Sequence, residues 1–131
     1  MAVSAADTNI VVRLLTRDDQ EQFLKAQAFF STNEVFLTDT VLLETKWVLC
    51  FAYSFSRQDT VGAFRLLIGL PNVLVADPER IQLALEWHEK GVDFGDALHL
   101  AACQDFGKMA TFDKAFIRRA KGLGRCMVSE P

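Results

Sequence analysis

The chain alternates short apolar segments with longer stretches of helical periodicity, and this alternation restricts the folds open to it. The segments typical of strands lie at 2–6, 35–38, 73–76, 109–112 and 126–128. The helical stretches lie at 10–15, 20–30, 41–53, 60–70, 79–90, 96–106 and 114–121. Strands that alternate with helices usually pair in parallel, because the helix carries the chain back to the edge of the sheet at which the previous strand began. We therefore expect an α/β fold, a three-layer α/β/α arrangement around a parallel, five-stranded sheet.

Local signals place several helix ends. Asp77 followed by Pro78 is typical of a helix start, and Gly69 is typical of a helix end. Either Asp39 or Thr40 can cap the stretch 41–53. That stretch is apolar nearly all round, so we expect it to be buried.

The composition indicates one globular domain, residues 1–131, without linker or repeat. Half of the residues are hydrophobic, which is enough for a sizeable core. The longest apolar run, 47–53, is too short to span a bilayer, and the chain start lacks the pattern of a signal peptide. The three cysteines have no CxxC spacing, so we expect neither disulfides nor a thiolate metal site, and a cytoplasmic protein.

Four carboxylates lie either between a predicted strand and the helix that follows it or within an otherwise apolar helix: Asp7, Glu44, Asp96 and Asp113. Asp7 follows the first strand and Asp113 the fourth. Ligands of open parallel sheets bind at the carboxyl ends of the strands, so we expect both at one edge. Each could also be an ordinary helix cap.

The other two acids differ in how easily local structure explains them. Glu44 has apolar helical neighbours, and a buried carboxylate must be paired or coordinated. Asp96 and Asp93 are three residues apart at a helix start, where they can cap the helix or share a cation. We expect His99, within an apolar context, to be packed and neutral, and we assign no function to His88.

An all-oxygen ligand set favours Mg²⁺ or Mn²⁺ over zinc. The chemistry that follows is metal-assisted hydrolysis of a phosphoester with one or two ions. The net charge of −3 is unlike that of a general nucleic-acid coat protein. A basic segment near the end could still bind phosphates or an acidic partner, or be a solvated helix face. Its basic residues are Lys108, Lys114, Arg118, Arg119, Lys121 and Arg125.

Four pieces, in this order and spacing, closely resemble the PIN-domain family and most of all the toxins of VapBC-type toxin–antitoxin modules. They are Asp7-Thr8-Asn9, Glu44, the run 93–102 (DFGDALHLAA) and the run 111–116 (TFDKAF). The resemblance implies a five-stranded parallel sheet and an Mg²⁺- or Mn²⁺-dependent endoribonuclease.

The resemblance also implies roles for particular residues and partners. Asp7, Glu44, Asp96 and Asp113 become the catalytic, metal-binding quartet, with Asn9 and Thr111 as polar support and Asp93 as a further acid. It implies a structured RNA substrate, a homodimer and an antitoxin whose tail enters the acidic groove. We expect the basic side chains of Lys114, Arg118, Arg119 and Lys121 to hold the RNA backbone.

Two other classes remain open from the residues alone. One is a non-catalytic, dimeric binding module whose acids recognise a basic peptide. The other is a receiver-type signalling domain, which wants adjacent acids after the first strand, where this chain has Thr8 and Asn9. Asn9 also disfavours a phosphatase with a DxD nucleophile.

Overall fold

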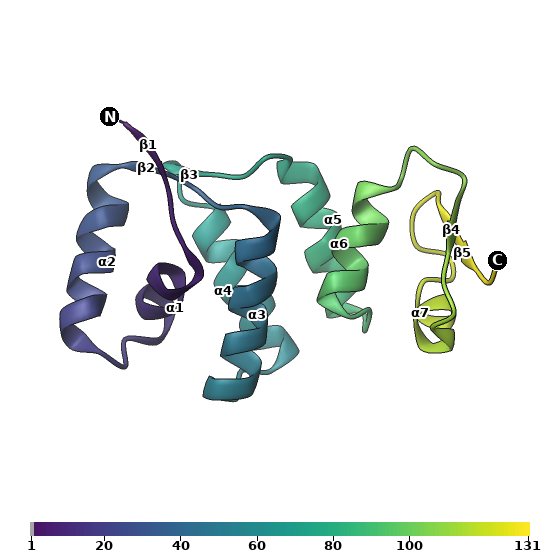
Figure 1. The fold of residues 1–131 in the computed structure, drawn as a ribbon, viewed down its shortest axis with the longest axis horizontal. Coiled ribbons are helices and arrows are strands. Elements are labelled where there is room, and N and C mark those ends of the chain that lie inside the picture. Colours follow the sequence, from purple (N-terminus) through teal and green to yellow (C-terminus); the bar gives the residue numbers. More distant parts are fainter. Residues whose placement is uncertain (1) are drawn as a thin grey trace. The chain divides into compact units, whose positions relative to one another are not determined.

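Strands are separated by one or two helices throughout residues 2–131, the part of the chain that the computed structural model describes (Figure 1). They form two compact units, Met1–Ala76 and Asp77–Pro131, each with its own parallel sheet. The α/β class with parallel strands is therefore confirmed. None of the helices in residues 2–131 has the length and apolarity to cross a membrane.

The first unit is built around three short parallel strands. Its elements are β1 (Val3–Ala5), α1 (Thr8–Thr16), α2 (Gln20–Thr32), β2 (Glu34–Phe36), α3 (Asp39–Tyr53), α4 (Arg57–Ile68) and β3 (Val73–Leu74). The strand order is β1-β2-β3. Helix α1 packs against both α2 and α3 (Figure 1). The buried side chains of Val11, Val35, Leu42, Leu49 and Phe64 form much of this core.

The register of β1 and β2 fixes where the helices begin. Ala5 is the partner of Phe36, and the Ala6 N–H donates to the Phe36 carbonyl at 3.2 Å. Two residues past each strand stand the N-caps of α1 and α3, Asp7 and Thr38. Both helices therefore start at the carboxyl edge of the sheet, and α1 lies beside α3.

The second unit consists of three helices and a two-stranded parallel sheet. Its elements are α5 (Pro78–Glu89), α6 (Phe94–Ala102), β4 (Lys108–Ala110), α7 (Lys114–Arg119) and β5 (Met127–Ser129). Helix α5 packs along α6, with Ile81, Leu85, Phe94 and Leu100 buried. Asp77 caps α5 by accepting from the Arg80 N–H, and Pro78 is its first residue, as the sequence predicts.

Several expectations need correction. The cap of α3 is Thr38, whose hydroxyl accepts from the Val41 N–H at 3.1 Å, because any of the three consecutive polar residues can accept there. Helix α6 ends at Ala102 instead of near Phe106. The outer face of α3 is not buried, since Trp47 is 46% and Phe51 86% exposed. Apolar character all round a short helix therefore did not decide its burial.

Helix α4 depends on a reciprocal capping box. The Asp59 N–H donates to Ser56 Oγ, and the Ser56 N–H donates to an Asp59 carboxylate oxygen, both at 3.0 Å. We expect Ser56→Ala to lower the free energy of unfolding by about 1 kcal/mol, because the first turn loses a hydrogen-bond acceptor. Urea unfolding measures this. The matched change Gln58→Ala, in the same exposed turn, should stay within about 0.5 kcal/mol of the parent.

Candidate functional site

Asp7 and Glu44 face one hollow in the first unit. Asp7 follows β1 and caps α1, where its Oδ1 accepts from the Thr8 N–H at 2.8 Å. The Thr8 hydroxyl donates to Glu44 Oε2 at 3.2 Å and so links α1 to α3 across 36 residues of sequence. The hollow measures about 300 Å³. Two carboxylates predicted from separate motifs thus share one concave surface.

The hollow also brings in residues that the sequence argument did not select. Its lining consists of Asp7, Thr8, Asn9, Val12, Arg13, Glu44, Val48 and Tyr53. Asn9 was predicted as support, whereas Thr8, Arg13 and Tyr53 were not. Arg13 comes four residues after Asn9 in α1, a spacing that places both on one helix face and could have found it. Nothing in the sequence pointed to Tyr53, which depends on how α3 packs.

The argument that placed Glu44 in the site was wrong in its physical premise. Its side chain is exposed, not buried in apolar surface, because its neighbour Trp47 is itself partly exposed on α3. What singles out Glu44 is its position over the start of α1 and its bond to the Thr8 hydroxyl.

The acids of the second unit crowd one another. Asp93 caps α6, and its Oδ2 accepts from the Asp96 N–H at 3.3 Å. Asp113 caps α7, and its Oδ1 accepts from the Ala115 and Phe116 N–H groups. Partial burial raises the pKa of the Asp96 carboxyl, and the negative charges of Asp93 and Asp113 raise it further, against a smaller opposing effect of His99. Asp93 and Asp113 are therefore helix caps, whereas Asp96 lies in the first turn of α6 and is not a cap, and the three acids repel one another.

A hollow of about 360 Å³ lies beside Asp96. It is lined by Asp96, His99, Ala102, Cys103, Met109, Ala110, Thr111 and Phe116. The Thr111 hydroxyl also accepts from the Asp113 N–H at 3.1 Å, so Thr111 connects this hollow to the start of α7. The structure thus gathers Asp96, Asp93, Asp113 and Thr111 within the second unit.

The two histidines behave differently from each other. His99 was expected to be packed, but it is exposed and lines the hollow of Asp96, because the apolar neighbours in its sequence point to the other side of α6. His88 is buried, its ring centroid lies 5.5 Å from that of Phe94, and its Nδ1 lies 2.7 Å from the Val92 carbonyl oxygen. His88 therefore has a packing role.

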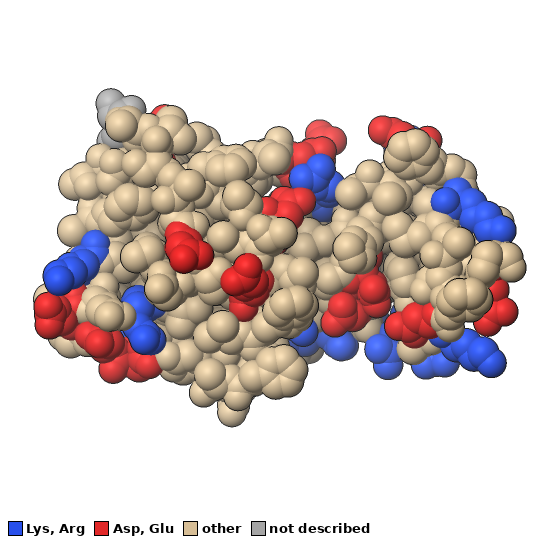
Figure 2. Space-filling view, in the orientation of Figure 1, with Lys and Arg blue, Asp and Glu red and all other residues tan. Residues whose placement is uncertain are grey.

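The basic residues of α7 separate into two groups. Lys114, Arg118 and Lys121 line a shared hollow of about 380 Å³, whereas Arg119 donates to the Gly91 carbonyl oxygen at 3.2 Å. Figure 2 shows Lys and Arg gathered along the lower edge of the right-hand end, where Figure 1 places α7. Three of the four predicted phosphate-binding residues thus share a surface.

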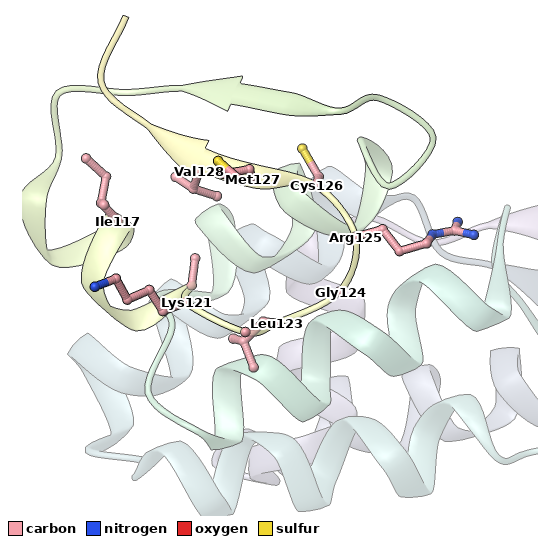
Figure 3. Close-up of a pocket in the computed structure, with 10 residues that line it drawn as sticks. Ile117, Lys121, Leu123, Gly124, Arg125, Cys126, Met127 and Val128 are labelled. Carbon is pink, nitrogen blue, oxygen red and sulfur yellow. The ribbon is translucent and has the colours of Figure 1, made fainter.

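A further hollow of about 410 Å³ lies between the end of α7 and β5 (Figure 3). Ile117, Leu123 and Val128 are among its apolar lining residues, and Lys121 and Arg125 extend away on opposite sides (Figure 3). It contains none of the four predicted acids.

The donor chemistry of both acid groups suits a hard divalent cation. Mg²⁺ is held by one or two carboxylates and completes its shell with water and phosphate, which matches the Asp7–Glu44 and the Asp96–Asp113 groups. Among residues 2–131, no three His, Cys, Asp or Glu side chains converge closely enough to hold a metal on their own. Each unit thus carries carboxylates for part of a coordination shell.

The family model of the PIN domain matches residues 5–122. The chain therefore belongs to the PIN-domain family, whose members are typically nucleases that generally use divalent metals, and the family points to RNA as the substrate. No curated protein sequence matches the chain significantly.

The crowding around Asp96 has a measurable pH signature. Its raised pKa means that the folded state binds the proton more tightly than the unfolded state, so this contribution to stability is largest at low pH and is lost as pH rises through that pKa. We therefore expect Asp96→Asn to be more stable than the parent at pH 7. Thermal unfolding from pH 4 to pH 8 should show this difference shrink towards low pH.

The control for this prediction is Asp105→Asn, which changes a carboxylate that is 95% exposed. Its unfolding midpoints should run parallel to those of the parent. If the unfolding midpoints of Asp96→Asn also run parallel to those of the parent at every pH, the claim that Asp93, Asp96 and Asp113 repel one another is wrong.

Proposed function

We propose that this chain is a divalent-metal-dependent endoribonuclease and the toxin of a VapBC-type toxin–antitoxin pair. The observation that carries the proposal is that Asp7 and Asp113 follow parallel strands β1 and β4 in a PIN-domain chain, with Glu44 in the hollow of Asp7 and Asp96 close enough to Asp113 for their charges to repel. The cytoplasm is the compartment in which such a toxin meets its RNA.

The active form is a single domain, 1–131, with a parallel, five-stranded sheet. Support comes from the parallel pairing of the strands in both sheets, β1-β2-β3 and β4-β5. Ligands of such sheets bind at the carboxyl ends of the strands, where Asp7 follows β1 and Asp113 follows β4.

Asp7, Glu44, Asp96 and Asp113 are the residues that would hold one or two Mg²⁺ or Mn²⁺ ions. When bound, such an ion would polarise a phosphoryl oxygen of RNA and lower the pKa of the attacking water. The protein's own groups keep the carboxylates in place: the Thr8 hydroxyl restrains Glu44, and Thr111 and Asp93 hold the starts of α7 and α6. Asn9 lines the same hollow as Asp7 and Glu44 and gives it a polar side chain.

The partners follow from two surfaces. Lys114, Arg118 and Lys121 bind the phosphate backbone of RNA. Arg119, which donates a hydrogen bond to the Gly91 carbonyl oxygen, adds positive charge beside them. The exposed aromatic rings of Trp47 and Phe51 on α3 support a protein–protein surface, used in a homodimer or by the antitoxin. A short reading frame for a DNA-binding antitoxin immediately upstream of this one is expected.

We expect Asp7→Asn and Asp96→Asn each to slow RNA cleavage by roughly a hundredfold or more, since loss of even indirect metal-site partners costs up to about that much. The assay is cleavage of a panel of structured RNAs at matched Mg²⁺ or Mn²⁺, after removal of contaminating nucleases.

Glu79→Gln is the matched control, because Glu79 is an exposed acid on α5 that lines neither acidic hollow. It should cleave at the parent rate. The nuclease proposal is wrong if Asp7→Asn and Asp96→Asn do so too.

A further inference from the structure

Arg13 is the one cation in the lining of the Asp7–Glu44 hollow, and three partners fix its direction. Its Nη1 donates to Asp18 Oδ1 at 2.9 Å and to the Tyr53 hydroxyl at 3.0 Å. Its Nε donates to Gln22 Oε1 at 2.6 Å. Tyr53 in turn donates to Asp18 Oδ2. The guanidinium of Arg13, on α1, thus has partners from α2, α3 and the turn between α1 and α2.

The position of Arg13 is between two hollows. The second, about 610 Å³, lies against α1 and α2 and is lined by Ala5, Asp7, Asn9, Ile10, Arg13, Gln22, Lys25, Ala26 and Phe29. Asp7, Asn9 and Arg13 therefore belong to both hollows. Of these three shared residues, Arg13 alone carries a positive charge.

The guanidinium retains binding capacity in this arrangement. Its bonds to Asp18, Tyr53 and Gln22 run from Nη1 and Nε, and Nη2 supplies two more N–H donors. The hydrogen bond from Tyr53, more than the charge of Arg13, holds the pKa of Asp18 below its usual range. Asp18 is thus charged at neutral pH, and it aligns Arg13 without removing its positive charge from the hollow.

A purely structural role explains these contacts less well. An ion pair whose side chains are 29% and 40% exposed adds little stability. The other arginine near the end of α1, Arg17, illustrates the alternative fate, since its guanidinium lies 4.6 Å from the Phe23 ring centroid and outside both hollows. Arg13 is instead fixed beside two carboxylates that would repel RNA if no cation offset them.

We propose that Arg13 binds the RNA phosphate next to the one that is cleaved, and that Tyr53, Asp18 and Gln22 are positioning residues that aim its guanidinium. The geometry matches arginine, whose planar fork can be held on one edge and bind phosphate with the other. This inference rests on the proposed function, because it takes RNA as the occupant of the Asp7–Glu44 hollow. Lys25 lines the second hollow, where the RNA strand would continue beyond Arg13.

The test is RNA affinity as a function of salt concentration, measured by anisotropy with a labelled single-stranded RNA of mixed sequence. The full chain carries Asp96→Asn to prevent cleavage, with Mg²⁺ present. In this background, Arg13→Gln should bind about tenfold more weakly. The slope of log affinity against log salt should lose about 0.7, the contribution of one phosphate contact on a single strand.

Tyr53→Phe separates the orientation of the Arg13 guanidinium from its positive charge. Because Arg13 keeps its charge, this variant should weaken binding several-fold while the salt slope stays at the parent value. Arg57→Ala is the control, since Arg57 is an exposed arginine at the start of α4 that lines neither hollow. Its affinity and slope should match the background.

The outcomes are separable. The inference is overturned if Arg13→Gln, folded by circular dichroism, keeps the affinity and slope of the background, or if the background binds no RNA. If Arg13→Gln fails to fold, an unchanged affinity in Tyr53→Phe overturns it. Failure of the proposed function gives a different result: a parent chain that binds the RNA without cleaving it contradicts the nuclease proposal, and cleavage by the Asp96→Asn chain contradicts the assignment of Asp96.

Discussion

The parallel pairing of β1 with β2 is the constraint on which the rest of the first unit depends. The register that sets Ala5 beside Phe36 also sets Asp7 and Thr38 at matching positions, two residues past the strands. Since both residues cap helices, α1 and α3 begin together at one edge. Glu44, in the second turn of α3, is thereby brought within 3.2 Å of the Thr8 hydroxyl. A slip of this register would separate Asp7 from Glu44.

The two units treat negative charge differently. In the first, a cation held by Asp18 and Tyr53 stands beside the carboxylates. In the second, Asp93 and Asp113 act with partial burial to disfavour the charge of Asp96. Destabilising charge of this kind is common at functional sites, where a bound cation restores the balance. Both arrangements agree with a site that is completed by a divalent ion and a phosphate.

The sequence predicted the order of strands and helices well, because periodicity and punctuation act locally. Asp77-Pro78 and Gly69 mark helix ends in the structure as expected. Packing was harder to predict. The exposure of Trp47, Phe51 and Glu44, and of His99, depends on which helix face meets a neighbour, and an apolar pattern all round a helix carries no such information. For the same reason Tyr53 emerged only from the folded first unit, whereas the spacing of Arg13 after Asn9 was a signal in the sequence.

The central proposal is that Asp7, Glu44, Asp96 and Asp113 are all required to bind Mg²⁺ or Mn²⁺. The most direct measurement is the Mn²⁺-dependent rise in melting temperature for Glu44→Gln, Asp113→Asn and the double variant. If all four carboxylates are required, each single change should abolish most of the rise, and the double variant should lose no more than either. Losses that simply add, or a parent that Mn²⁺ does not stabilise, would contradict the account.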